Sequence, residues 1–214
     1  MNTKTKKMVM MAMFSAVAFV MVALIRIPIV LFLSYEPKDV IITIAGFLFG
    51  PLMALAVSAI SSFIEFLTIS STGVIGLIMN VLGSCAFACT AAFIYKKDHT
   101  MKGAWLGLIG GTLLMTAVML LWNYLITPLY MGVPREAVVE LLVPAILPFN
   151  LFKALLNSAL TLILYKPVVG ALRKISLVEP TSKNAKPTKL GYMLVALVLL
   201  ITCIIWGMVL KGVI

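Results

Sequence analysis

The sequence predicts an all-α, polytopic membrane protein, and two features of its composition support that prediction. Of its 214 residues, 63% are hydrophobic and 11% are charged, whereas soluble domains are roughly half apolar and about a quarter charged. The apolar residues also form near-continuous runs of the length that crosses a bilayer. A soluble enzyme, a disulfide-rich secreted scaffold and a disordered tail are therefore excluded.

Basic residues provide the topology signal. Seventeen Lys and Arg outnumber seven Asp and Glu, and most of these bases lie in three clusters between apolar runs. Such clusters mark cytoplasmic segments under the positive-inside rule, so we expect a cell-membrane protein with a cytoplasmic N-terminus; nucleic-acid binding is the weaker interpretation. The clusters are Lys4, Lys6 and Lys7; Lys96, Lys97 and Lys102; and Lys166, Arg173, Lys174, Lys183, Lys186 and Lys189.

Six apolar runs form the expected core domain, residues 1–175. We expect spans at about 8–25, 38–49, 51–68, 74–95, 103–127 and 144–166. The 38–49 helix is short for a hydrocarbon core of roughly 30 Å and must be shielded by its neighbours.

The connections follow from punctuating residues. Arg26 and Pro28 end the first run, Gly50-Pro51 predicts a tight turn between two helices, and 69–73 forms an outer turn. A polar outer loop is expected to carry Arg135, Glu136 and Glu140.

A basic linker and a seventh helix follow the core. Residues 176–189 contain prolines and lysines, which predict a cytoplasmic linker, and 190–214 contain the apolar run 190–210, which predicts an additional transmembrane helix. We interpret this helix as an appendage to the six-helix domain.

The densest group of polar side chains inside a span is Asn150, Lys153 and Asn157. They stand at i, i+3 and i+7 and share one helix face. Packing asparagines with a snorkelling lysine are one interpretation. We favour a hydrogen-bonding platform for a buried ligand, because ionisable groups inside spans are costly.

Other polar positions are weaker candidates. Asn123 lies at a similar depth, between Trp122 and Tyr124, which are equally typical of ligand stacking and of an interfacial belt. Asn80, which follows Met79, is a weaker candidate. Glu65 lies near the outer end of its helix, and solvation at the membrane surface is the slightly favoured interpretation.

Two further segments have competing interpretations. The outer segment with Tyr35, Glu36, Lys38 and Asp39 either closes over a site or is simply solvated. Ala12 and Ala16 have the small-xxx-small spacing that lets another helix approach closely, a frequent pattern in membrane helices.

Signatures of enzymes and of metal sites are lacking in the sequence. It contains no His-Glu-x-x-His, Gly-x-Ser-x-Gly or P-loop pattern. The single His99 and the three cysteines at 85, 89 and 203 form no metal-spaced set. We therefore expect no catalysis, no metal and no cofactor, and any energy for transport must come from a partner or an ion gradient.

Several segments, taken together, resemble the riboflavin-specific S component of energy-coupling-factor (ECF) vitamin transporters. The likeness covers about residues 8 to 175. It rests on Tyr35-Glu36-Pro37-Lys38-Asp39-Val40, Gly46-Phe47-Leu48-Phe49-Gly50-Pro51, Ser71-Thr72-Gly73, Gly76-Leu77-Ile78-Met79-Asn80, Trp122-Asn123-Tyr124, Pro128-Leu129-Tyr130-Met131-Gly132-Val133-Pro134 and Leu147-Pro148-Phe149-Asn150-Leu151-Phe152-Lys153.

The resemblance implies a six-helix membrane subunit that binds riboflavin, with flavin mononucleotide (FMN) as a further ligand, near the outer face. It implies vitamin contacts by Glu36, Asn123, Asn150 and Lys153, to which we add Asn157, Met79, Asn80 and Phe149 as expected site residues. It also implies that Ala12 and Ala16 dock on a transmembrane coupling protein, which two cytoplasmic ATPases complete. The seventh helix departs from the six-helix pattern.

Three rival functions remain at this point. One is an S component for folate, thiamine or pantothenate. Another is a membrane enzyme with Glu65 and Lys153 as catalytic groups. The third is a structural or assembly subunit that binds partners but no small molecule.

Overall fold

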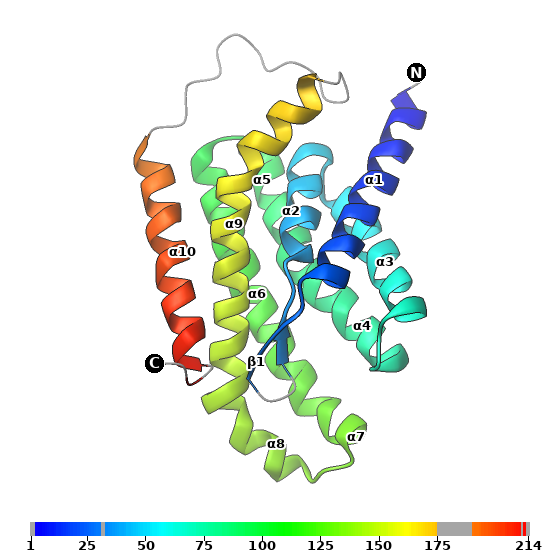
Figure 1. The fold of residues 1–214 in the computed structure, drawn as a ribbon, viewed down its shortest axis with the longest axis vertical. Coiled ribbons are helices and arrows are strands. Elements are labelled where there is room, and N and C mark those ends of the chain that lie inside the picture. Colours follow the sequence, from blue (N-terminus) through cyan, green and yellow to red (C-terminus); the bar gives the residue numbers. More distant parts are fainter. Residues whose placement is uncertain (1–2, 31–32, 175–189, 211, 213–214) are drawn as a thin grey trace.

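Helices dominate the computed structural model, which describes residues 3–30, 33–174, 190–210 and 212 (Figure 1). Within these residues, six helical stretches are long and apolar enough to cross a membrane. They are Lys4–Leu24, Pro51–Thr68, Gly73–Lys97, Met101–Leu125, Arg135–Lys174 and Met193–Leu210. The prediction of an all-α, multi-pass membrane protein is confirmed.

The part of the chain up to residue 68 contains three helices and a hairpin. The elements are α1 (Thr3–Leu24), β1 (Ile27–Val30), β2 (Leu33–Tyr35), α2 (Lys38–Phe49) and α3 (Pro51–Thr68). From residue 73 onward, every regular element within the described residues is a helix. These elements are α4 (Gly73–Ser84), the π-helix η1 (Cys85–Cys89), α5 (Thr90–Lys97), α6 (Met101–Leu125), α7 (Thr127–Met131), α8 (Arg135–Leu141), the π-helix η2 (Leu142–Ile146), α9 (Leu147–Lys174) and α10 (Leu190–Leu210).

The short helix α2 is enclosed by the bundle, as its length requires. Nine of its twelve residues are buried, and α1, α3, α5 and α9 pack around it. The turn after it is the predicted one: Gly50 has φ +94° and Pro51 occupies the first turn of α3. A positive φ suits glycine, and proline at a helix start loses no hydrogen bond.

Close contact between α6 and the preceding π-helix and α5 depends on small residues. A Cβ at Gly107 would lie 2.6 Å from the Ala91 carbonyl oxygen, and one at Gly111 would lie 2.5 Å from that of Phe87. Such glycines let backbones approach within a membrane, where burial of apolar surface supplies little driving force between helices.

Two connections differ from the expectations. The segment after α1 forms an antiparallel hairpin that pairs Ile27 with Tyr35 and Pro28 with Ser34, where only an interrupted polar loop was expected. The expected outer loop with Arg135, Glu136 and Glu140 is helical instead and continues through η2 into α9. Pro144 lies in η2, where a π-helical turn accommodates the missing N–H of proline.

Different elements lie at the two ends of the bundle. The start of α1, the α5–α6 connection and the end of α9 lie together at the top of Figure 1, whereas the hairpin, α7 and α8 lie toward the bottom. The described members of all three predicted basic clusters therefore share one end.

Helix α10 packs along α9 and also touches β1 (Figure 1). The prediction of a seventh apolar helix is confirmed in its bounds, Leu190–Leu210. The predicted linker, 176–189, lies outside the described residues.

Candidate functional site

A cavity of about 270 Å³ lies among the hairpin, α4, α6, α7 and α9. Small-molecule sites begin at roughly 300 Å³, so the space suits a compact ligand. Its lining comprises Arg26, Leu33, Ser34, Glu36, Asp39, Ser71, Thr72, Ile75, Gly76, Met79, Asn80, Gly83, Ser84, Met115, Met119, Trp122, Asn123, Ile126, Thr127, Tyr130, Phe149, Asn150 and Lys153.

The α9 wall contains three of the expected site residues. Phe149, Asn150 and Lys153 all line the cavity, because positions three and four apart share a helix face. Asn150 donates from Nδ2 to the Ile146 carbonyl at 2.8 Å. That bond fixes the amide and keeps the side-chain oxygen of Asn150 as an acceptor for a ligand.

The α6 wall contains Asn123, whose amide is also fixed by its own helix. Its Nδ2 donates to the Met119 carbonyl at 2.7 Å, and its Oδ1 accepts from the Thr127 hydroxyl at 2.9 Å. A second N–H of the amide is still available to a ligand. The two aromatic neighbours of Asn123 have different environments. Trp122 lines the cavity, whereas Tyr124 is 37% exposed.

The α4 wall contributes Met79 and Asn80, between two glycines. Gly76 and Gly83 line the cavity on either side of them. A Cβ at Gly76 would lie 1.7 Å from Thr72 Oγ1, so the turn that carries Thr72 requires glycine there. Gly76 thus lets the start of α4 pack closely on the Thr72 turn at the edge of the cavity.

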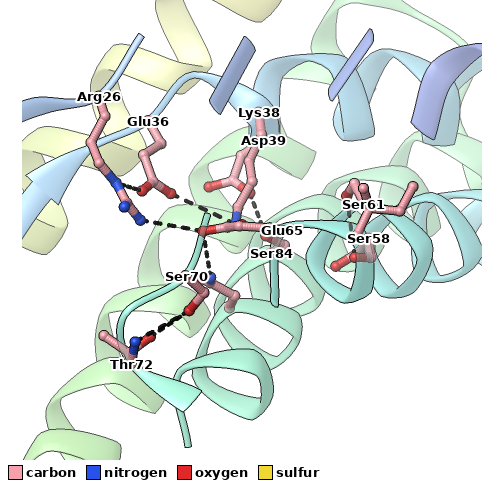
Figure 2. Close-up of polar contacts among 12 residues, drawn as sticks. Arg26, Glu36, Lys38, Asp39, Ser58, Ser61, Glu65, Ser70, Thr72 and Ser84 are labelled. Atoms are coloured by element: carbon pink, nitrogen blue, oxygen red, sulfur yellow. Dashed lines mark hydrogen bonds and ion pairs between the residues drawn. The ribbon is translucent and has the colours of Figure 1, made fainter. Parts of the chain in front are cut away.

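An ion-pair network lies beside the cavity, with Glu65 at its centre (Figure 2). The Glu65 carboxylate accepts from Lys38 Nζ at 2.7 Å, and its exposed fraction is 1%. It also accepts from Asn80 Nδ2 at 3.1 Å. The favoured interpretation of a solvated Glu65 is therefore wrong, because Glu65 joins α3 to α2 and α4 inside the bundle.

The Glu65 contact also determines how Asn80 meets the cavity. A carboxylate only accepts hydrogen bonds, so the atom of Asn80 that faces it is the NH₂ group. The carbonyl oxygen of Asn80 is thereby available to accept a hydrogen bond from a ligand.

Arg26 completes the network and was missed as a site residue. Its Nε lies 2.7 Å from Glu36 Oε1 and its Nη2 lies 3.3 Å from Glu65 Oε1, and Figure 2 shows the guanidinium between the two. Arg26 lines the cavity and its side chain is 41% exposed. In the sequence, Arg26 directly follows an apolar run, so it was interpreted only as the end of a membrane span.

Glu36 is surrounded by cations. Burial alone would raise its pKa, but Lys153, Lys38 and Arg26 outweigh burial and hold the pKa of this carboxyl below its ordinary value. The Glu36 carboxylate therefore stays charged although the residue is only 5% exposed, and it lines the cavity beside Lys153.

Asn157 belongs to a different set of contacts. It is fully buried and is not among the residues that line the cavity. Its Oδ1 accepts from the Tyr35 hydroxyl at 2.9 Å, and its Nδ2 lies 3.3 Å from Asp39 Oδ2. Asp39 also accepts from Ser84. These contacts tie α9 to the hairpin and to α2, and a ligand contact by Asn157 stays a prediction.

The segment that contains Tyr35, Glu36, Lys38 and Asp39 is buried in full. Glu36 and Asp39 line the cavity. Lys38 points into the ion-pair network, and Tyr35 points into the bundle. This position agrees with the interpretation in which the segment closes over a site, and not with the interpretation in which it is solvated.

The pair Ala12 and Ala16 lies on the outer face of α1. Both are exposed, as are Met8 and Val20 on the same stripe. Small side chains leave this face accessible to another helix.

A second cavity, of about 90 Å³, lies nearer the basic end of the bundle. It is mainly apolar and is lined in part by Phe47, Tyr95, Tyr165 and Lys166. Its few polar groups contrast with those of the larger cavity, so the larger one is the better site for a ligand with polar edges.

The fold and site define a multi-pass helical membrane protein with a polar binding cavity at one end of its bundle. The model of the family "ECF transporter, substrate-specific component" matches residues 6–165. The chain therefore belongs to the family of substrate-specific (S) components of ECF transporters.

Curated relatives and a solved structure agree with that family. The chain is 30% identical to "Riboflavin transporter RibU" of Staphylococcus aureus (strain TCH60), over 80% of this chain and 95% of the relative. It is 34% identical to "Riboflavin transporter FmnP" of Bacillus subtilis (strain 168), over 71% and 86%. A solved S component of a bacterial ECF transporter superposes with a TM-score of 0.68 at 30% identity, covering 80% of this chain and 99% of that one.

Proposed function

We propose that this protein is the riboflavin-binding S subunit of an ECF transporter. The observation that supports this function best is the set of polar groups at Asn80, Asn123, Asn150 and Lys153, which converge on one cavity. Riboflavin is the substrate in the names of the relatives RibU and FmnP, and the cavity has the chemistry that a flavin requires.

The isoalloxazine ring has an apolar dimethylbenzene end and a polar pyrimidine edge. Phe149, Met79 and Trp122 provide apolar lining, while the fixed amides of Asn123 and Asn150 provide a donor and an acceptor for an imide. Lys153 adds a charged donor for a flavin carbonyl. Each unpaired polar group costs roughly 1–3 kcal/mol, so complementarity between these amides and the imide is what favours a flavin.

The ribityl chain needs further partners. Ser34, Thr72 and Thr127 bring hydroxyls to the cavity, and Glu36 brings a carboxylate. FMN carries a phosphate in addition, and the exposed part of Arg26 at the cavity offers a cation for it. We propose riboflavin as the main substrate and FMN as a further ligand.

The proposed orientation has the basic end of the bundle in the cytoplasm, in keeping with the positive-inside rule. The cavity then lies toward the outside, where the vitamin is captured. The Ala12 and Ala16 face of α1 is the proposed contact with a coupling protein, and two ATPases supply the energy. The protein itself then needs no catalytic residue and no cofactor.

The test is a fluorescence titration of riboflavin with the purified, detergent-solubilised protein. We expect saturable quenching at one site per chain, with no competition by folate, thiamine or pantothenate. Absence of quenching together with saturable binding of one of those vitamins would move the assignment to another S component. Turnover of a lipid or peptide without ATPase partners would favour the membrane enzyme.

A further inference from the structure

Helix α10 lies outside the residues that the family model matches, yet its inner face makes specific contacts. Cys203 is 1% exposed, and Trp206 packs in one cluster with Tyr35, Phe152 and Leu156. The opposite face of the helix is apolar and exposed; Ile205 is 50% exposed. Helix α10 therefore has one side that faces lipid and one side that contacts α9 and the hairpin.

Phe152 is the point where α10 meets α9. Its ring packs edge-on against Trp206, with centroids 6.3 Å apart at 84°. Gly207 brings the two helices together: a Cβ there would lie 3.0–3.1 Å from two ring carbons of Phe152. Phe152 directly precedes Lys153 of the cavity wall.

Tyr35 continues this contact into the hairpin. Its ring packs edge-on against Phe152, with centroids 6.0 Å apart at 65°. Successive side chains of a strand point to opposite faces. Tyr35 accordingly faces α9 and α10, while Ser34 and Glu36 on either side of it line the cavity.

We propose that α10 is a brace that holds the hairpin in place over the binding cavity. Trp206 is the positioning residue of this brace. Trp206 holds Phe152, Phe152 holds the ring of Tyr35, and the Tyr35 hydroxyl is held by Asn157 at 2.9 Å. This row of contacts fixes the end of β2, and Glu36 follows directly after it at the cavity wall. The brace slows the escape of bound ligand, because the hairpin must move away from α9 before the cavity opens.

The proposal rests on the proposed riboflavin function, and its test separates the two. Stopped-flow fluorescence gives the association and dissociation rate constants of riboflavin for the purified full chain. For Trp206→Ala we expect dissociation about threefold to tenfold faster, the range that corresponds to one lost aromatic pair, with little change in association. Trp206→Phe, which keeps a ring at the contact, should recover most of the slow dissociation.

The matched control on the same helix is Ile205→Ala, one residue away on the lipid face. It should leave both rate constants unchanged. Equal dissociation rate constants for Trp206→Ala and Ile205→Ala would overturn the brace and leave α10 as a helix that packs in the bilayer. Wild-type protein that binds no riboflavin would instead overturn the proposed function.

Gly207→Ala provides a second test if Trp206→Ala does not fold. The added methyl displaces the Phe152 ring by a few tenths of an ångström, so dissociation should again become faster. Gly170→Ala on α9 is the control, because nothing lies within 4 Å of the added carbon there. An unchanged dissociation rate constant in folded Gly207→Ala would contradict the proposal.

Discussion

At the scale of single residues, the cavity is formed by side chains whose hydrogen-bonding groups are oriented before a ligand arrives. Asn80, Asn123 and Asn150 each donate one amide N–H to a fixed protein acceptor. The remaining amide atoms are therefore oriented in advance, and ligand binding loses less side-chain entropy. Substitutions at this scale should change affinity through single lost contacts.

Lys153→Ala should weaken riboflavin binding by roughly tenfold to a hundredfold, the range for a lost charged hydrogen bond. Asn150→Ala should weaken it by a smaller factor. Equilibrium fluorescence titration measures both, and Lys166→Ala, an exposed lysine on the same helix, is the control. Wild-type affinity in both cavity variants would show that the α9 wall is not the site.

Glu65→Gln should destabilise the fold more than a surface substitution does. Removing one charge of a buried pair costs about 3–5 kcal/mol, since Lys38 is then left without its closest anion. Thermal unfolding in detergent measures the loss, with Glu140→Gln on the exposed face of α8 as control. The double variant Glu65→Leu, Lys38→Met should recover much of the stability; a further loss instead would contradict the pairing.

The Glu36 carboxyl gives a dependence on pH with a definite sign. Because its pKa is lowered in the folded protein, its contribution to stability is fully present above the usual range of about 4.3. That contribution is lost as the pH falls through the lowered pKa. The unfolding temperature of wild type should therefore fall more steeply at acidic pH than that of Glu36→Gln. Parallel curves would mean that the three cations do not favour the charged form.

The sequence identified most of these residues but not their partners. Asn123, Asn150, Lys153, Met79, Asn80, Phe149 and Glu36 were predicted at the site and all line the cavity. Arg26 was not predicted there and Glu65 was favoured as a solvated residue, because they are 39 residues apart and each lies near the end of an apolar run. Only the arrangement of α1 beside α3 brings their charges together.

At the scale of elements, the long helices and the Gly50-Pro51 turn were predictable, whereas the hairpin and α8 were not. The bounds of α2 and α3 follow from the apolar runs and from Gly50-Pro51. The hairpin was not predicted, since its strands have four and three residues and no glycine-rich turn marks it. Helix α8 was mistaken for a loop because its charged side chains are exposed and Pro144 follows.

The exposed stripe of α1 leads to a prediction about transport. Ala12→Leu with Ala16→Leu should impair riboflavin uptake by cells while leaving affinity of the purified subunit unchanged, because bulk on this face prevents a partner helix from approaching. Ala171→Leu, at an exposed alanine of α9, is the control and should transport normally. Loss of binding in the double variant would argue against a docking role.

At the scale of the whole molecule, charge and chemistry separate along the bundle axis. The described basic clusters share one end, while the hairpin and the polar cavity lie toward the other (Figure 1). This separation was predictable, because clusters of lysines between apolar runs indicate which ends of the spans lie on the same side of the membrane. The packing of α10 was not, since its sequence is apolar on all sides.

The most direct test is the structure of the protein determined with riboflavin bound. We expect density for the isoalloxazine ring between the α9 wall at Asn150 and Lys153 and the α4 wall at Met79 and Asn80. Density in the smaller apolar cavity beside Tyr95 and Tyr165, with the larger cavity empty, would contradict it.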